Sequence, residues 1–338
     1  MQLIDVLFVL LPDSLLLDLA GPAEAFRLAN QVIARQPHAK PLFRLRYVGP
    51  QTAVTSSVGL SLNNIEPLPL GFDAAAQSTW VVLLGRPGVA QFVLKRTAPF
   101  MDVRNWLSNM VAPRLTQSAS QPNHYTCRLV TVCVGALLAA DAGLLHGKRC
   151  TTHHELLESL AACSKDSHVI ANRVFVEDGP ISTSAGVTAG IDLALHLIAQ
   201  ECGEAIASSV AQVMVAFARR SESDQERSPL LEWRSHLHPA VHRVQEAINA
   251  DPREEWTVLK LAQVACVTER HLNRLFVQHA GLTPRDYIET VRLAIADHAL
   301  RSGMKLAKAA QVSGFGTARR LTQARARQTH KTLGVKNG

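Results

Sequence analysis

The C-terminal third of the chain carries one hydrophobic pattern twice. Its first copy places apolar residues at i, i+3, i+4 and i+7 of a short segment, at Val258, Leu261, Ala262 and Ala265. After a two-residue turn, the segment 268–279 keeps the same spacing, and Thr268 is a good N-cap for it. This period predicts two short helices that each bury one face, the arrangement of a helix-turn-helix unit.

The second copy begins at Leu306, in the place that Val258 holds in the first, and the turn 315–317 follows it. Between the copies, Thr283 and Pro284 are a cap and first residue typical of a longer helix. The pattern therefore predicts an all-α domain in which one helix joins two helix-turn-helix units.

One position departs from this repeat. Phe276 stands four residues after Leu272 in the first copy, whereas Arg325 stands four residues after Leu321 in the second. A lone guanidinium does not stay in an apolar core. We therefore expect Arg325 to start on the buried face and to weaken the second unit.

The second helix of each unit keeps polar side chains on its outer face. They are Thr268, Glu269, Arg270, Asn273 and Arg274 in the first unit, and Thr317, Arg319, Arg320 and Gln323 in the second. Such side chains bind base edges and phosphates in a major groove, so these residues are candidate DNA contacts. The alternative is an ordinary helical bundle with a solvated, charged face.

Charge is divided unevenly along the chain. Residues 229–338 hold 17 Lys+Arg against 9 Asp+Glu, and the remaining residues hold 18 against 19. A basic module beside a nearly neutral body is typical of nucleic-acid-binding proteins. A basic helix on a membrane surface is the competing explanation, but these charges lie on short elements.

Strand-like and helix-like segments alternate over the first two hundred residues. Apolar runs predict strands at 4–11, 43–48, 80–84, 129–132, 174–177 and 181–183. Helical patterns predict helices at 22–34, 133–142 and 187–199. This alternation predicts an α/β domain with a doubly wound, mostly parallel sheet.

The segment 219–236 is polar, mixed in charge and poor in helix signals, and we interpret it as a linker. It separates an N-terminal domain at 1–218 from a DNA-binding domain at 237–331. The six cysteines lack zinc-type spacing, which favours a reducing, cytoplasmic location without a metal site. The N-terminus lacks the basic region of a signal peptide, and no apolar run reaches membrane length.

The C-terminal motifs resemble a known family. The runs 268–276 and 283–293 and the triplet 314–316 are similar to the DNA-binding domain of the AraC/XylS family. The resemblance covers roughly residues 238–325 and implies two units that read successive major grooves. The closing Gly-x-x-Pro-x-x-Tyr signature of that family is missing here.

The N-terminal motifs resemble a second family. The runs 15–24, 132–136, 142–147, 151–153 and 183–186 are similar to the ThiJ/PfpI branch of the class I glutamine amidotransferase-like superfamily, whose fold is flavodoxin-like. Fused to an AraC-type module, this is the layout of the GlxA/FtrA-like transcriptional regulators. In relatives that are enzymes or thiol sensors, an elbow cysteine lies near a glutamate and a histidine, and the motifs imply that these are Cys133, Glu24 and His153.

The elbow predicts a pocket with a definite chemistry. A thiol at a helix N-terminus feels the helix dipole, so we expect a lowered pKa for Cys133. Backbone N–H groups near Gly85 are suited to a carboxylate or an oxyanion, whereas Asp18 and Glu24 favour a cationic or amine-bearing ligand. The alternative is that Cys133 is simply a small buried apolar residue.

These observations predict a cytoplasmic, sequence-specific transcriptional regulator, an activator by resemblance. Its expected partners are a double-stranded DNA operator, a small-molecule effector, RNA polymerase and a second copy of the chain, with no membrane and no cofactor. The alternative function is a cysteine-dependent hydrolase, amidase or glyoxalase-like enzyme tethered to DNA. We predict that the chain is not an enzyme.

Overall fold

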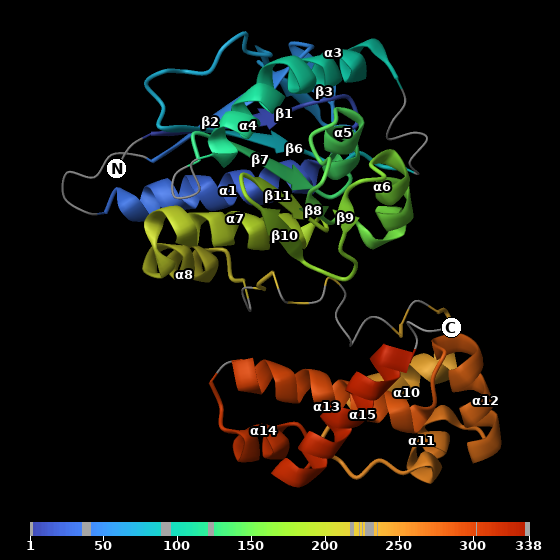
Figure 1. Ribbon diagram of the computed structural model, residues 1–338. Helices are drawn as coiled ribbons and strands as arrows, with labels where there is room; N and C mark the ends of the chain where they lie inside the picture. The colour runs from blue at the N-terminus through green and yellow to red at the C-terminus, as the bar shows by residue number, and fades with distance from the viewer. Residues whose placement is uncertain are drawn as a thin grey trace. The chain divides into compact units, whose positions relative to one another are not determined.

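The chain folds into two compact units, Met1–Glu226 and Arg227–Gly338 (Figure 1). The computed structural model describes residues 3–35, 42–88, 96–120, 125–216, 220–222, 224, 226, 233–234, 236–301 and 303–334. The division falls inside the predicted linker. The first unit has one hydrophobic core, and the second unit has two, one for each helix-turn-helix pair.

A seven-stranded sheet with the order β10-β11-β7-β6-β1-β2-β5 forms the centre of the first unit. Its strands are β1 (Ile4–Val9), β2 (Phe43–Gly49), β5 (Glu66–Pro67), β6 (Ser78–Leu83), β7 (Cys127–Val132), β10 (Phe175–Asp178) and β11 (Ile181–Ser184). All neighbouring pairs are parallel except β10 with β11. The predicted mostly parallel sheet is confirmed, and its central strands are buried throughout because both faces are covered.

Helices cover both faces of this sheet (Figure 1). One face carries α1 (Leu16–Ile33), α7 (Thr188–Cys202) and α8 (Glu204–Val213), and the other carries α3 (Ala98–Trp106) and α4 (Ala112–Ala119). The smaller elements are β3 (Ala53–Thr55), β4 (Ser61–Asn63), η1 (Leu107–Val111), α5 (Gly135–Asp141), β8 (Arg149–Cys150), η2 (His154–Leu156), α6 (Leu157–Cys163) and β9 (His168–Val169).

The first helix begins earlier than its sequence indicates. We predicted its start at Pro22, but α1 begins at Leu16 and holds Pro22 inside it. A Cβ atom on Gly190 of α7 would stand 3.5 Å from the Pro22 ring, and one on Gly21 would stand 2.7 Å from Ile191. This close packing of α1 on α7 offsets the backbone hydrogen bond that proline cannot donate.

The second unit is entirely helical within its described residues. Its helices are α10 (Pro239–Ala250), α11 (Val258–Ala265), α12 (Glu269–Ala280), α13 (Pro284–Arg301), α14 (Leu306–Val312) and α15 (Ala318–Gly334). The pairs α11–α12 and α14–α15 are the two predicted helix-turn-helix units, and α13 joins them. The N-terminal half of α13 packs into the core of the first helix-turn-helix unit, and its C-terminal half packs into the core of the second helix-turn-helix unit.

Arg325 does not lie in the core of the second helix-turn-helix unit. Leu321 and Ala324 are fully buried, whereas the Arg325 side chain is 51% exposed and its Nε lies 3.3 Å from Asp297 Oδ1 of α13. The residue three positions after Leu321 faces the core, and the residue four positions after it faces outward. The expected defect at Arg325 is therefore wrong.

The predicted linker is anchored where the structure describes it. Arg220 Nε donates to Asp192 Oδ2 at 2.8 Å, and the Asp224 carbonyl accepts from the backbone N–H of Val174 at 3.2 Å. Further on, the side chain of Trp233 packs against the core of the second unit. The two ends of this segment thus belong to different units.

Candidate DNA interface and elbow site

Threonine caps fix the start of each helix in the first helix-turn-helix unit. The Thr257 hydroxyl accepts from the Lys260 N–H of α11 at 3.2 Å, and the Thr268 hydroxyl accepts from the His271 N–H of α12 at 3.3 Å. Between the helices, Cys266 has φ of 56°, in the left-handed region. This sharp turn separates the two helix axes and leaves the first turn of α12 at the surface.

The predicted DNA-contacting face of α12 is open to solvent. Glu269, Arg270 and Arg274 are exposed, and Asn273 is half-buried. Asn273 Nδ2 donates to the Glu269 carbonyl at 3.0 Å, and Arg274 Nη2 lies 3.0 Å from His271 Nδ1. Within the described part of the chain, the Arg270 side chain makes no hydrogen bond or ion pair. It is therefore the side chain that is freest to bind a base or a phosphate.

The second helix-turn-helix unit presents a similar solvent-exposed polar face on α15. The Thr317 hydroxyl accepts from the Arg320 N–H at 3.3 Å and so caps α15, while Arg319, Arg320 and Gln323 are exposed. One turn further along, Arg327 Nη2 pairs with Glu289 Oε2 of α13 at 2.7 Å. Within the described residues, the side chains of Arg319 and Arg320 make no hydrogen bond or ion pair, whereas Arg325 and Arg327 pair with carboxylates of α13.

Arg292 of α13 was not predicted, yet it ties the two helix-turn-helix units together. Its Nε donates to the Pro252 carbonyl and its Nη2 to the Glu254 carbonyl, both at 2.8 Å. On its other side, a Cβ atom on Gly314 would stand 2.9 Å from Arg292 Nε. The turn of the second helix-turn-helix unit therefore packs directly on the Arg292 side chain, which also binds the loop before α11.

Cys133 occupies a strained elbow between β7 and α5 in the first unit. Its φ is 55°, and only 4% of the residue is exposed. Its N–H donates to the Ser184 carbonyl at 3.1 Å, and its own carbonyl accepts from Thr152 Oγ1 at 2.8 Å. Gly186 closes the site, because a Cβ atom there would stand 2.7 Å from Cys133 Sγ. The thiol is thus held in a tightly packed site.

The carboxyl group beside Cys133 belongs to Asp18. Its Oδ2 accepts from the Gly85 N–H at 3.1 Å and its Oδ1 accepts from the Val187 N–H at 3.0 Å. A Cβ atom on Gly85 would stand 2.5 Å from Asp18 Oδ2 and 2.9 Å from Cys133 Cβ, so glycine is required between them. Burial raises the pKa of Asp18 to about 6, and the two N–H donors only partly oppose this.

The thiol of Cys133 is not activated. Burial raises its pKa to about 12, and the nearby negative charge of Asp18 adds to the effect. The expected lowering of this pKa by the helix dipole is wrong, because desolvation outweighs the field of the short helix α5. At neutral pH the group is a neutral thiol, which is a poor nucleophile.

Glu24 and His153, the other two members of the predicted set, have partners of their own. Glu24 is half-exposed and its Oε2 pairs with Arg27 Nε at 2.7 Å. His153 stacks on His154 with ring centroids 4.3 Å apart, and burial lowers the pKa of His153. Among the described residues, no hydrogen bond joins Cys133 Sγ to either side chain. Of the predicted pocket residues, the structure brings Asp18 and Gly85 together with Cys133 at the elbow, whereas Glu24 pairs with Arg27.

Glu24 instead lines a separate cleft of about 410 Å³. Its apolar wall consists of Leu10, which follows β1, and Leu19, Ala20 and Ala23 of α1. Its polar groups come from Glu24, Tyr47 and the β4 strand, and burial, with a smaller contribution from the charge of Glu24, raises the pKa of Tyr47. An apolar wall with a few polar groups is the usual composition of a small-molecule site.

Comparisons with known proteins match both units. The profile of a family described as Helix-turn-helix domain matches residues 261–335, and that of the DJ-1/PfpI family matches residues 112–200. The HTH-type transcriptional regulator CdhR of Pseudomonas aeruginosa is 30% identical over 301 residues, 88% of this chain and 80% of the relative. The HTH-type transcriptional regulator GbdR of the same species is 28% identical over 312 residues, 91% of this chain and 77% of the relative.

An enzyme also matches the first part of the chain. Isonitrile hydratase of Pseudomonas putida is 32% identical over 214 residues, which cover 62% of this chain and 77% of the enzyme. The relatives that match along most of the chain are regulators.

Proposed function

The chain belongs to the family of HTH-type transcriptional regulators that join a DJ-1/PfpI domain to an AraC-type helix-turn-helix domain, and from this premise we propose how its two units divide the work. It is a DNA-binding regulator of transcription. The second unit contacts DNA through the N-terminal turns of α12 and α15. The first unit binds a small-molecule effector that governs DNA binding.

The exposed polar residues at the start of α12 and α15 support this assignment of DNA contacts. Arg270 is free in the described structure, whereas Lys260 of the same unit is held by Glu254, with Nζ and Oε1 2.6 Å apart. If Arg270 binds a guanine edge, Arg270→Ala weakens binding to the operator by about 1–3 kcal/mol and relaxes specificity at one base pair.

The measurement is a titration of labelled operator and scrambled DNA with the wild type, Arg270→Ala and the control Lys260→Ala. The control loses little on either DNA because its ammonium is already paired. Equal losses for Arg270→Ala on both DNAs would remove the base-reading role and leave a phosphate contact.

The cleft beside α1 is the proposed effector site, and its composition supports a class of ligand. Glu24 supplies a negative charge, Tyr47 an aromatic ring with a hydroxyl, and Leu10 and Leu19 an apolar wall. A small molecule with an amine or other cationic group beside an apolar part fits this set.

A thermal-shift screen of amines tests the effector assignment. The hits are then titrated into the wild type, Glu24→Gln and the control Glu158→Gln, whose carboxylate is exposed on α6. Loss of affinity only in Glu24→Gln supports the cleft. Equal affinity in all three proteins places the effector elsewhere.

The chain is a regulator rather than an enzyme. The relatives that match most of its length are regulators, and the Cys133 thiol carries a raised pKa. We infer that Asp18 and Cys133 shape the fold around the elbow and do not turn over a ligand. A hit that is consumed by the wild type but not by Cys133→Ala contradicts this inference.

Dimerisation, contact with RNA polymerase and a cytoplasmic location complete the proposal. Repeated half-sites on DNA commonly match symmetric dimers, and light scattering of the purified chain tests this state. Within the residues that the structure describes, no helix has the length and apolar character needed to cross a membrane.

A further inference from the structure

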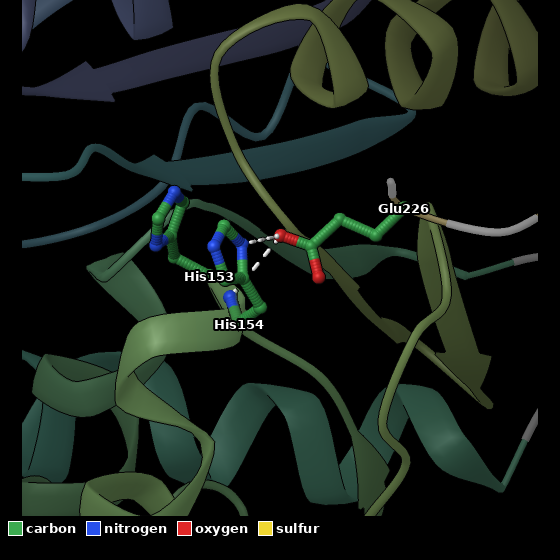
Figure 2. A group of neighbouring side chains, drawn as sticks. All are labelled: His153, His154 and Glu226. Carbon is green, nitrogen blue, oxygen red and sulfur yellow. Dashed lines mark hydrogen bonds and ion pairs between the residues drawn. The ribbon is translucent and has the colours of Figure 1, made fainter. Parts of the chain in front are cut away.

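Three side chains that have no role in the proposed function converge at the end of the first unit. His153 and His154 lie at the start of the short helix η2, and Glu226 is the last residue of the unit. Each offers one potential ligand atom, and these atoms all lie within 4.8 Å of one another. Figure 2 shows the Glu226 carboxylate facing the imidazole of His154, with the His153 imidazole beside that ring.

Contacts within the cluster hold it together. Glu226 Oε1 accepts from the backbone N–H of His154 at 3.1 Å and lies 2.8 Å from His154 Nδ1. The side chains of His153, His154 and Glu226 are 27%, 35% and 10% exposed. The cluster is therefore accessible from solvent but sheltered enough to keep its geometry.

Two imidazoles and one carboxylate are a donor set that suits zinc and similar divalent transition metals. Two ligand atoms on one tetrahedral zinc ion stand about 3.4 Å apart, given metal–ligand bonds of about 2.1 Å. The hydrogen-bonded atoms have to move slightly apart, and the most distant atoms have to approach by up to about 1.4 Å, which rotation of a half-buried imidazole allows.

A neighbouring carboxylate is placed to support such a site. Glu155 Oε2 lies 3.8 Å from His153 Nδ1. Histidine ligands usually donate their second N–H to a carboxylate or a carbonyl, which fixes the ring orientation. The cluster therefore contains three ligands and a group able to orient one of them.

From this arrangement we propose that His153, His154 and Glu226 form a binding site for a divalent transition-metal ion. The ion would fasten the last residue of the first unit to helix η2. Three protein ligands would leave one coordination position open. The proposal does not depend on the effector or on the DNA contacts.

Calorimetric titration of Zn²⁺ into the full, chelator-stripped and reduced chain tests the site. The variants are His154→Ala and Glu226→Gln, which keeps the size of the side chain, and the control is His168→Ala, an exposed imidazole on β9. We expect one Zn²⁺ per chain in the wild type and the control, and binding about ten- to hundredfold weaker in both site variants. The thermal midpoint should rise with Zn²⁺ only in the wild type and the control.

Cysteines are competing zinc ligands, so the same proteins are titrated with Co²⁺. Visible d–d bands without a thiolate-to-cobalt charge-transfer band support nitrogen and oxygen ligands. Absence of binding in the wild type, equal affinity in all four proteins, or a thiolate band that persists in Glu226→Gln overturns the proposal. Circular dichroism of the zinc-free variants separates loss of the site from loss of the fold.

Discussion

The two helix-turn-helix units share a backbone pattern but bury different side chains. Among the described residues, the first core includes Phe276, Tyr287 and Ile248, whereas five of the eight buried residues of the second core are alanine. Stabilisation by burial scales with the apolar area removed from water, at about 25 cal/mol per Å². The second helix-turn-helix unit therefore gains much less stability from apolar burial than the first helix-turn-helix unit does.

Polar contacts on α13 partly replace that missing core. Arg325 pairs with Asp297 and Arg327 pairs with Glu289, but all four side chains are at least one-third exposed. Exposed pairs of this kind contribute about 0.2–1 kcal/mol each. The first helix-turn-helix unit therefore stabilises the domain, whereas the second packs against it and unfolds locally more easily.

Truncation of the equivalent core leucines tests this difference most strongly. Leu272 and Leu321 are both fully buried at matching positions. Leu272→Ala is expected to cost about 3–5 kcal/mol, and Leu321→Ala about 2 kcal/mol because its neighbours are small. Denaturant unfolding measures both losses. Hydrogen exchange should show that Leu321→Ala exposes α14 and α15 while α11 and α12 stay protected.

Removal of the Arg292 side chain is expected to uncouple the two helix-turn-helix units. Arg292→Ala leaves the Pro252 and Glu254 carbonyls without their donor and should cost about 2 kcal/mol. Binding to an operator with both half-sites should weaken more than binding to a single half-site. Arg292→Lys is the control, since it keeps the charge but cannot donate to both carbonyls in the same geometry. Equal losses on both operators would contradict a coupling role.

The periodic elements were predictable from sequence because helix and strand periods are local. Asp18 was predicted as a pocket residue, but its contacts were not, because it meets Gly85 and Val187 across 67 and 169 residues of chain. A signal existed: an aspartate within Leu15-Leu-Leu-Asp-Leu is a charge among residues that are expected to be buried. Glu24 was predicted from the motif.

Helical spacing alone also could not place Arg325, because positions i+3 and i+4 both lie near the face of residue i. Packing on α13 decides between them, and it selects Ala324. The metal-type cluster was equally hidden, since Glu226 reaches His154 across 72 residues of chain. Local patterns thus predicted the elements, whereas tertiary contacts determined which polar groups meet.

Acid should weaken the first helix-turn-helix unit more than the second. His236 and His238 pack near His242 and His279, and burial lowers the pKa of both below the ordinary 6.5. Above pH 6.5 both groups are neutral in either state and cost nothing. As pH falls below 6.5, the unfolded chain takes up protons first, so stability is lost until the pH passes the lowered values.

Unfolding of the wild type and of His236→Gln at several pH values between 7.5 and 5 measures this effect. The variant should lose less stability on acidification than the wild type. An identical pH dependence in both proteins would show that His236 does not carry it.

The smallest expected effect concerns Arg325. An aromatic residue there would face solvent rather than the core, because Ala324 already occupies the buried position next to Leu321. Arg325→Phe therefore gains no buried area and loses one exposed ion pair with Asp297, a change of about 0.2–1 kcal/mol in the destabilising direction. Thermal unfolding of the wild type, Arg325→Phe and Arg325→Ala measures it, and the two variants should melt alike. If Arg325→Phe instead melts several degrees above both other proteins, α15 can rotate its outer face inward, and the alanine-rich core has room that a larger side chain fills.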